Sequence, residues 1–395
     1  MSDAWLSIVG INDDGLSGLS VASRNAIDNA DSIFGGSRHL KLVGAGERGF
    51  PWPVPFSVDQ VIARRGEQVV VLASGDPFWY GAGGSLSEHL EPDEWTVFPA
   101  PSSFSLAASR LGWRLEETVC FGLHAAPFTR LRAVLSKGVR AICLVRDGDA
   151  VAQLAQWLVA HDFGPSRLTV LEALGGADER IRTQISDQYS LSDVNYPVSV
   201  AIDCEGPGGL SRACGLNDDL FEHDGQITKQ PIRAMTLSAL APKPGEVLWD
   251  IGAGSGSIAI EWLLAAPGTR AWALESDTAR AGRIHCNGER FGLEHRLNVI
   301  ETTAPDGLHN LPPADAVMVS GGASEALFEA LWTILPVGCR IVANAVTLES
   351  ETLFSQWAAS KGGSLLRLEM SRAHPLGSKR GWRAAMPIVQ WSVTI

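Results

Sequence analysis

Hydrophobic residues along the chain gather in short runs, and amphipathic stretches separate these runs. The runs in the first half predict buried strands at 5–9, 69–73, 96–98 and 141–145. The hydrophobic spacing of the first half also predicts helices at 102–111 and 150–160. Strands that alternate with helices indicate an α/β fold class with a mainly parallel sheet covered on both faces.

The second half shows the same alternation with its own set of elements. Its apolar runs predict strands at 247–251, 271–275, 298–301, 316–319 and 340–344. The stretches between them predict helices at 257–266, 278–291, 325–335 and 350–360. The two halves do not align with each other, so the chain is not an internal duplication.

A polar, glycine-rich stretch at about 204–224 separates the halves and shows little apolar periodicity. We interpret residues 206–224 as a linker between a first domain at 1–205 and a second at 225–395. A surface loop inside a single domain is the alternative. The linker is favoured because each flank carries its own strand, glycine loop and helix.

Composition narrows the possible classes of function. With 45% hydrophobic and 19% charged residues, the 395-residue chain can bury the cores of two domains. The net charge of −12 argues against nucleic acid as the main partner but allows an anionic small molecule in a local basic pocket. No signal peptide or membrane-spanning run is recognisable, so we expect a cytoplasmic protein that is not bound to a membrane. The six cysteines lack metal-binding spacing, so we expect reduced thiols and no metal.

The sharpest local signal is a glycine loop that follows the strand predicted at 247–251. Gly252, Gly254 and Gly256 alternate with small residues, which permits a tight turn and close approach of a ligand. A dinucleotide fingerprint would place glycine where Ser257 stands, so the spacing fits a nucleoside without a pyrophosphate. Glu275 ends the next predicted strand, where a carboxylate can accept hydrogen bonds from ribose hydroxyls. Asp250 is expected to hold the loop or the ammonium group of the ligand.

The loop, the acid and their spacing resemble the class I S-adenosylmethionine-dependent methyltransferases, which implies a Rossmann-like second domain. A tight strand–helix connection without a ligand is the alternative. Amine methyltransferases of this fold carry an Asn/Asp-Pro-Pro-aromatic motif after the fourth strand. Here that strand leads to Ser320-Gly321-Gly322, so methylation of carbon or oxygen is favoured over methylation of an amine.

The first half carries a Ser-Gly-Asp-Pro sequence at the end of its strand at 69–73. Taken alone, Gly75-Asp76-Pro77 would be an ordinary turn. It is accompanied by other strand-end loops, including one where Ser102 or Ser103 is placed to cap a helix. Together these motifs resemble the class III tetrapyrrole methyltransferases of corrin biosynthesis. The subgroup is marked by Gly35-Gly36-Ser37-Arg38-His39-Leu40, Ser102-Ser103-Phe104 and Leu174-Gly175-Gly176-Ala177-Asp178-Glu179-Arg180-Ile181.

The second half is similar to the partner enzyme that methylates and decarboxylates the same macrocycle. The resemblance rests on residues 224–229, Arg233, 250–256, 319–322 and 344–349. The pair implies methylation of carbons 5 and 15 of precorrin-6B and loss of CO₂ from its ring C acetate, which gives precorrin-8X in cobalamin biosynthesis. Carbon 5 would be methylated by the first domain, and carbon 15 methylation and decarboxylation would belong to the second. Relatives of both halves self-associate, which implies a homo-oligomer.

The resemblance also implies which residues bind the cofactor, S-adenosyl-L-methionine. In the first half they are Gly75, Asp76, Pro77, Ser102 and Ser103. In the second half they are Thr228, Asp250, Gly252, Ala253, Gly254, Ser255, Gly256, Glu275 and Ala304. No catalytic residue is predicted.

A basic cluster near the C-terminus is a candidate for binding the carboxylates of the substrate. Its members are Arg372, Lys379, Arg380 and Arg383. A solvated basic loop is the alternative.

Two other functions compete with this one. A nucleic-acid methyltransferase is disfavoured by the acidic charge and by the missing Pro-Pro-aromatic motif. A non-catalytic binding module is disfavoured by the intact glycine loops of both halves.

Overall fold

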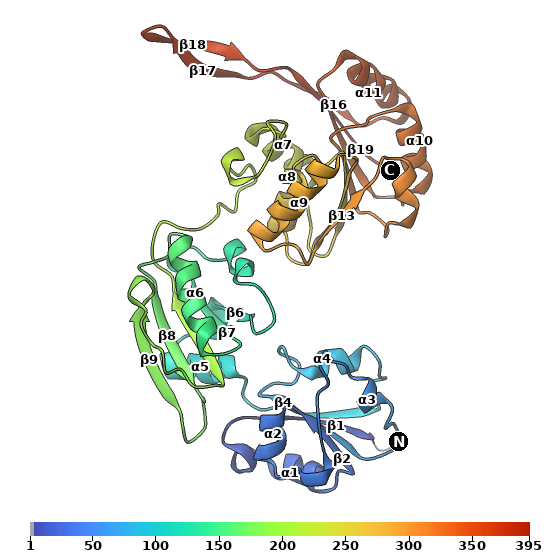
Figure 1. Cartoon of the computed structure of the whole chain (residues 1–395). Helices are drawn as coiled ribbons and strands as arrows, with labels where there is room; N and C mark the ends of the chain where they lie inside the picture. The colour runs from blue at the N-terminus through green and yellow to red at the C-terminus, as the bar shows by residue number, and fades with distance from the viewer. Residues whose placement is uncertain (1–3) are drawn as a thin grey trace. The chain divides into compact units, whose positions relative to one another are not determined.

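The computed structural model describes residues 4–395 and divides the chain into two compact units (Figure 1). The first unit runs to Phe128 and resumes over Val134–Gly209, and the second consists of Thr129–Ala133 and Leu210–Ile395. Residues 1–3, the start of the first predicted domain, lie outside the described residues. The boundary at Gly209 lies within the stretch interpreted as a linker.

The first unit begins with a five-stranded sheet whose strand pairs are all parallel. In spatial order its strands are β3 (Gly49–Pro51), β2 (Ser32–Gly35), β4 (Val69–Ser74), β1 (Leu6–Ile11) and β5 (Trp95–Phe98). The accompanying helices are α1 (Val21–Asp28), α2 (Ser37–Leu42), α3 (Asp59–Ile62) and α4 (Ala82–Ser87). Alternate residues of β1 face two separate cores, Leu6 and Ile8 in one and Val9 and Ile11 in the other. Burial on both faces explains the continuous apolar run in the sequence.

A second sheet completes this unit. Its spatial order is β6 (Thr118–Gly122), β7 (Arg140–Leu144), β10 (Val198–Asp203), β8 (Arg167–Glu172) and β9 (Arg180–Ile185). Only β6 and β7 pair in parallel, so the prediction of a mainly parallel sheet is wrong here. The physical reason is connection length, because the short loop from β8 to β9 cannot hold the crossover that parallel strands need. Helices α5 (Ser103–Leu111) and α6 (Gly148–Ala160) agree with the predicted helices within two residues.

The second unit is built on a seven-stranded sheet. Its spatial order is β13 (Leu297–Glu301), β12 (Arg270–Glu275), β11 (Val247–Ile251), β14 (Ala316–Val319), β15 (Arg340–Ala345), β19 (Ile388–Thr394) and β16 (Ser364–Leu368). The first five strands are parallel, and β19 runs antiparallel to both of its neighbours. All five predicted strands are confirmed within one residue.

Helices cover both faces of this sheet. One core contains side chains of α7 (Gln230–Leu240), α8 (Ser257–Ala265) and α9 (Thr278–Phe291). The core on the other face contains side chains of α10 (Glu325–Ile334) and α11 (Leu348–Lys361). This doubly wound arrangement confirms the Rossmann-like fold expected for the second domain.

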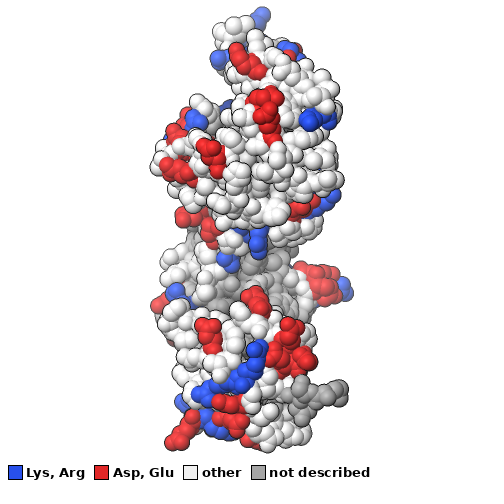
Figure 2. Space-filling model, turned by 90° about the vertical axis from the view of Figure 1, so that its right-hand side faces the viewer, with Lys and Arg blue, Asp and Glu red and all other residues white. Residues whose placement is uncertain are grey.

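The basic residues near the C-terminus lie on an exposed hairpin made of β17 (Ser371–Leu376) and β18 (Lys379–Ala384), red in Figure 1. Arg372 and Arg383 are direct partners in its register, and both are exposed. Elsewhere the charges mix: on the face drawn in Figure 2, acidic and basic side chains lie in small interspersed groups. No basic area spans that face, in keeping with the acidic net charge.

Residues 210–224, part of the predicted linker, pack onto the second unit around one buried arginine. Arg233 of α7 has no exposed surface and forms an ion pair with Glu261 of α8, which is also buried. The carboxylate of Glu261 also accepts hydrogen bonds from the backbone amides of Gly215 and Leu216. This part of the predicted linker therefore belongs to the second compact unit, whereas residues 206–209 belong to the first.

The segment Thr129–Ala133, which comes from earlier in the chain, also packs within the second unit. The guanidinium of Arg132 lies 5.3 Å from the centre of the Phe291 ring. A Cβ atom on Gly292 would lie only 2.3 Å from the carbonyl oxygen of Thr129, so glycine is required there. The C-terminal end of α9 is thus fitted to this segment.

We predict that Arg233→Met lowers the free energy of unfolding of the second unit by about 3–5 kcal/mol, because the Glu261 carboxylate stays buried without its partner. Denaturant titration followed by tryptophan fluorescence measures the change. Arg367→Met is the matched control, since the side chain of Arg367 is 55% exposed in its pair with Glu351. Its loss should stay below about 1 kcal/mol. Equal losses in the two variants would contradict the prediction.

Candidate functional site

The glycine loop after β11 has a backbone conformation that only glycine adopts readily. Gly252, Gly254 and Gly256 have φ angles of 67°, 61° and 72°, all in the left-handed region. A Cβ on Gly252 would lie 2.7 Å from the backbone nitrogen of Gly321, and one on Gly256 would collide with α9. Beside Gly254 the nearest atom to such a Cβ is the carbonyl oxygen of Gln226, at 3.9 Å. Of the three positions, the loop therefore leaves open space only at Gly254.

Glu275 holds this loop from the end of β12. Its buried carboxylate accepts hydrogen bonds from the backbone amides of Gly254, at 2.8 Å, and of Asp277, at 3.0 Å. Asp277 in turn caps the N-terminus of α9. Sequence reasoning placed the carboxylate against a ligand and did not foresee these backbone bonds. Each carboxylate oxygen has a second lone pair, so Glu275 can still accept a bond from a ligand hydroxyl.

Asp250 is the most perturbed acid of the site. Its Oδ2 accepts a hydrogen bond from the amide of Ala259 in the first turn of α8, at 3.2 Å. Its Oδ1 is buried and has no partner among the described residues. Burial raises the pKa of Asp250 to about 7, and the nearby charge of Glu275 also raises it. Asp250 thus holds the start of the helix and keeps one oxygen available.

The segment at 224–229 lies over the glycine loop and is tied to α9. The carboxylate of Asp224 pairs with Arg280, at 3.0 Å, and with Arg283, at 3.1 Å. The side-chain amide oxygen of Gln226 accepts a further bond from Arg280. At the other end of the segment, the carbonyl of half-buried Thr228 accepts a bond from Arg233. Both ends of the segment are therefore anchored.

The other cofactor residues predicted for this unit lie at the same edge of the sheet. The amide of Ala253 donates to the carbonyl of Leu274 at the end of β12, at 3.1 Å. Ser255 is buried, and its hydroxyl has no partner within the described residues. Ala304 is half-buried in the loop that follows β13. The structure thus gathers these predicted residues at one strand edge.

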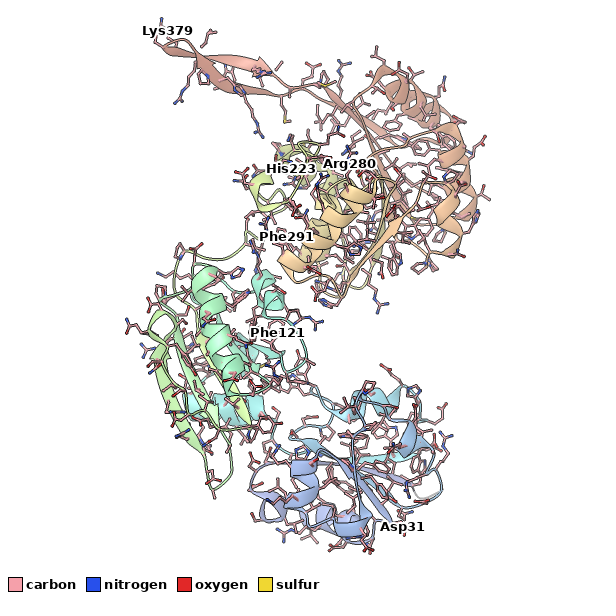
Figure 3. The ribbon with its side chains drawn as sticks, in the orientation of Figure 1. Asp31, Phe121, His223, Arg280, Phe291 and Lys379 are labelled. Carbon is pink, nitrogen blue, oxygen red and sulfur yellow. The ribbon has the colours of Figure 1, made fainter. Side chains whose placement is uncertain are left out.

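The basic hairpin does not join this group. Figure 3 labels Lys379 at the tip of the hairpin, well apart from Arg280 beside the loop. All four predicted substrate-binding side chains are exposed, and they lie on a separate two-stranded sheet. Their role stays a prediction.

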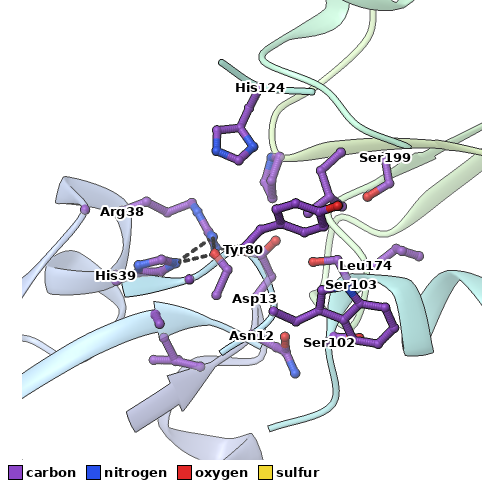
Figure 4. Close-up of a pocket in the computed structure, with 18 of the residues that line it drawn as sticks. Asn12, Asp13, Arg38, His39, Tyr80, Ser102, Ser103, His124, Leu174 and Ser199 are labelled. Carbon is purple, nitrogen blue, oxygen red and sulfur yellow. Dashed lines mark hydrogen bonds and ion pairs between the residues drawn. The ribbon is translucent and has the colours of Figure 1, made fainter. Parts of the chain in front are cut away.

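The first unit contains a cavity of about 590 Å³ (Figure 4). The carboxyl ends of β1 and β4 line one part of it, the second sheet contributes Leu144 and Ser199, and the loop after β7 contributes Arg146. Two of the predicted cofactor residues, Ser102 and Ser103, line it as well. The hydroxyl of Ser102 accepts a bond from the amide of Ser105, which confirms the predicted helix cap.

Gly75, Asp76 and Pro77 are not among the residues that line the cavity. They form the turn behind it. A Cβ on Gly75 would lie 2.7 Å from Cα of Ser102, and one on Gly10 would overlap the Gly75 carbonyl. The turn therefore lets three strand ends meet closely and positions Ser102. Direct contact of these three residues with a cofactor stays a prediction.

A charged cluster in this cavity was not recognised as a site from the sequence. Arg38 of α2 forms an ion pair with Asp13, and its other terminal nitrogen donates to Nε2 of His39, at 2.8 Å, and to the Ser74 hydroxyl. Because a guanidinium can only donate, Nε2 of His39 accepts and Nδ1 carries the proton. Burial, and secondly the charge of Arg38, lower the pKa of His39 to about 4, so its ring is neutral at pH 7. His124 also lines the cavity.

The sequence signal for this cluster was the adjacent pair Arg38 and His39, which follows Gly35 and Gly36. Sequence analysis used this motif only as a marker of the family.

Two kinds of feature are absent from residues 4–395. These residues contain no group of three or more His, Cys, Asp or Glu side chains placed to bind a metal ion. None of their helices is both long enough and apolar enough to cross a membrane.

Comparison with protein families matches each half of the chain to a methyltransferase family. The family of Tetrapyrrole (Corrin/Porphyrin) Methylases matches residues 6–187. The Precorrin methyltransferase domain family matches residues 219–395. The two matches agree with the two resemblances found in the sequence.

Individual relatives extend this result over the whole chain. A Sinorhizobium protein named precorrin-6Y C(5,15)-methyltransferase [decarboxylating] is 47% identical over 400 residues, covering 99% of this chain and 96% of that protein. A Pyrobaculum calidifontis protein named probable cobalt-precorrin-6B C(15)-methyltransferase (decarboxylating) is 37% identical over 141 residues, covering 34% of this chain and 72% of that protein. The crystal structure of the C-terminal domain of a Rhodobacter capsulatus precorrin-6Y C5,15-methyltransferase is 50% identical, covers 47% of this chain and 100% of that domain, and has a TM-score of 0.46.

We predict that Asp250→Asn raises the unfolding temperature of the second unit at pH 8 by a few degrees. Folded Asp250 keeps its proton up to about pH 7, whereas the unfolded residue loses it near 3.8. Between these values the folded state binds more protons, so wild-type stability falls as pH rises. Asparagine carries no charge to bury and still accepts the bond from Ala259.

Scanning calorimetry from pH 4 to pH 8 measures this effect, with exposed Asp219→Asn as the control. The Asp250 variant should lose part of the decline in stability between pH 4 and pH 7. A decline as steep as that of the wild type would show that Asp250 is ionised throughout.

Proposed function

The chain belongs to the family of precorrin-6Y C5,15-methyltransferases (decarboxylating), and on this premise we propose that both of its units bind S-adenosyl-L-methionine and act on one precorrin. The proposed reaction methylates carbons 5 and 15 of precorrin-6B and removes CO₂ from its ring C acetate, which gives precorrin-8X. The observation that carries the proposal is 47% identity over 99% of the chain. A strand-end loop in each unit supports it.

The second unit fits the cofactor in three respects. Space is open beside Gly254, where a ligand can approach the backbone. Glu275 can accept bonds from ribose hydroxyls. The unpartnered Oδ1 of Asp250 is available to an ammonium group, which would hold the aspartate in its charged form. The segment at 224–229 covers the remaining side.

In the first unit, the cavity is the proposed binding site for the cofactor. Ligand sites of small molecules measure roughly 300–1,000 Å³, and a cavity of about 590 Å³ lies within that range. Ser102 and Ser103 line it. We assign these two residues to the cofactor, with Gly75, Asp76 and Pro77 shaping the turn that positions them.

The methyl transfer needs little chemical assistance from the side chains of the protein. The cofactor, when bound, supplies a methyl group already activated on a sulfonium. The conjugated macrocycle supplies a nucleophilic carbon, so the chain's residues mainly need to align the two reactants and exclude water. For decarboxylation, the protonated nitrogens of the macrocycle can accept the electron pair. Arg372, Lys379, Arg380 and Arg383 remain candidates for binding its carboxylates.

We assign carbon 5 to the first unit, and carbon 15 together with decarboxylation to the second. The Pyrobaculum relative supports this division, because it matches only 34% of this chain and its name combines C(15) methylation with decarboxylation. Self-association and a cytoplasmic location are retained as predictions. A nucleic-acid substrate is disfavoured by the family and by the net charge of −12.

The direct test supplies the purified chain with precorrin-6B and S-adenosyl-L-methionine and weighs the product. Two added methyl groups and one lost CO₂ are expected. A product without the loss of CO₂, or with a single methyl group, would contradict the proposed function.

The division of activities predicts the product of Gly254→Val in the full chain. The new side chain occupies the open space beside the loop, so the second unit should lose cofactor binding. The product should then gain one methyl group and keep its carboxylate. Gly245→Val is the matched control, since Gly245 also has a positive φ, of 81°, and no atom within 4 Å of its added Cβ. Loss of CO₂ at the wild-type rate in Gly254→Val would refute the division.

A further inference from the structure

The cavity of the first unit has a wall of aromatic rings and two cations, Arg38 and Arg146, that the proposed function does not use. Trp52, Phe56, Trp79 and Tyr80 line the cavity together with Arg38. We propose that this wall is the binding site for the flat macrocycle, with the rings against its conjugated face and Arg38 bound to one of its side-chain carboxylates. The proposal rests on the proposed function, because it assigns a wall of that same site.

The exposure of these rings points to a ligand. Phe56 is 51% exposed, Tyr80 is 52% exposed and Trp79 is 36% exposed, although aromatic side chains of this size contribute most when they are buried. Exposed rings that gather in one cavity provide apolar surface for a partner that is itself flat and apolar on its faces. Stacking on such rings is the usual way in which proteins hold planar conjugated ligands.

The rings are fixed in place before any ligand arrives. Trp52 and Phe56 pack edge to face with their centres 5.0 Å apart. Prolines at 53 and 55 fix two φ angles in the loop that carries them. The second pair of rings, Trp79 and Tyr80, comes from the turn after β4.

Tyr80 is held in a backbone conformation that tyrosine rarely adopts. Its φ is 58°, in the left-handed region. Its hydroxyl donates to the carbonyl of Cys120, at 3.2 Å, and its ring lies where a Cβ on Gly122 would fall, 2.8 Å from the ring. Residues kept in such sparsely populated conformations concentrate at ligand sites. The second sheet therefore fixes Tyr80 at the cavity in spite of the unfavourable φ.

Arg38 has hydrogen-bond donors left for a carboxylate. Asp13, His39 and Ser74 take three of its N–H groups, which leaves the Nε–H and one further N–H on the nitrogen that faces Asp13. Its side chain is 27% exposed, so it is partly desolvated and still reachable. The neutral ring of His39 adds no charge of its own. Asp13 orients the guanidinium, and a second carboxylate can bind to it.

Arg38 faces the proposed cofactor residues across the cavity, whereas Trp79 and Tyr80 pack on Phe104 next to them, with ring centres 4.8 Å and 5.9 Å from that of Phe104. In Figure 4, Arg38 and His39 lie on one side, Ser102, Ser103 and Leu174 lie on the other, and Tyr80 lies between them. An adenine ring is the competing occupant of an aromatic wall. The KM for precorrin and the KM for the cofactor, measured in the same variants, distinguish the two ligands.

The first experiment measures binding without turnover. Uroporphyrin, a flat porphyrin with several carboxylates, serves as the probe, and quenching of tryptophan fluorescence in the full chain reports its binding. Arg38→Gln should weaken binding about 10-fold or more, and Phe56→Ala about 5-fold or more. Val54→Ala, in the same loop but 99% exposed, is the control for Phe56. Arg114→Gln, with a side chain 73% exposed, is the control for Arg38.

The second experiment measures turnover with precorrin-6B and a cofactor that carries a ¹³C methyl group, so that NMR locates each added methyl. Each variant should raise the KM for precorrin in carbon 5 methylation by a factor similar to its loss of uroporphyrin binding. Each should leave the KM for the cofactor unchanged. Loss of CO₂, which is assigned to the second unit, should continue at the wild-type rate, and the unchanged KM for the cofactor in carbon 5 methylation shows that the first unit is folded.

The outcomes separate the two claims. Wild-type binding and wild-type KM for precorrin in both variants would overturn the inference, as would a raised KM for the cofactor in place of precorrin. A wild-type chain that binds uroporphyrin through these residues but forms no methylated product would overturn the proposed function and keep the binding site. Phe56 is half exposed, so its variant stays informative even if Arg38→Gln unfolds.

Discussion

The buried pair of Arg233 and Glu261 determines how the second unit is assembled. Two opposite charges with almost no exposed surface are tolerated only when their remaining donors and acceptors are also satisfied. Here the partners that satisfy them are the Asp218 carboxylate and backbone groups of residues 215–228, so the segment before α7 must close around the pair. This closure places the residues at 224–229 over the glycine loop. The geometry of the proposed cofactor site is thus linked to an ion pair that contributes no atom to it.

Sequence patterns predicted the elements of the second unit well because the relevant information is local. The runs at 247–251 and 316–319 coincide with β11 and β14, and the alternating glycines at 252–256 occupy a strained turn that only glycine allows. The cap formed by Ser102 is likewise a local property, because it needs only a hydroxyl three residues before an amide. Such features follow from a few neighbouring residues.

The sequence could not reveal contacts that depend on tertiary packing. Asp13 follows β1 and Arg38 belongs to α2, which follows β2, so the two meet only because β4 pairs with both of these strands in the sheet. The antiparallel pairing of β8 and β9 follows from the length of a loop, and apolar runs are the same in either direction. Glu275 was assigned to a ligand from its position at a strand end, and only the folded loop shows that backbone amides already bind it.

The segment Thr129–Ala133 has a consequence for dividing the chain into separate products. The second unit contains these five residues although they precede Leu210 by most of the second sheet of the first unit. One break in the reading frame therefore cannot release two complete units, since any cut near Gly209 leaves the segment on the upstream product. The downstream product would lack the residues that pack against Phe291 and Gly292 at the end of α9.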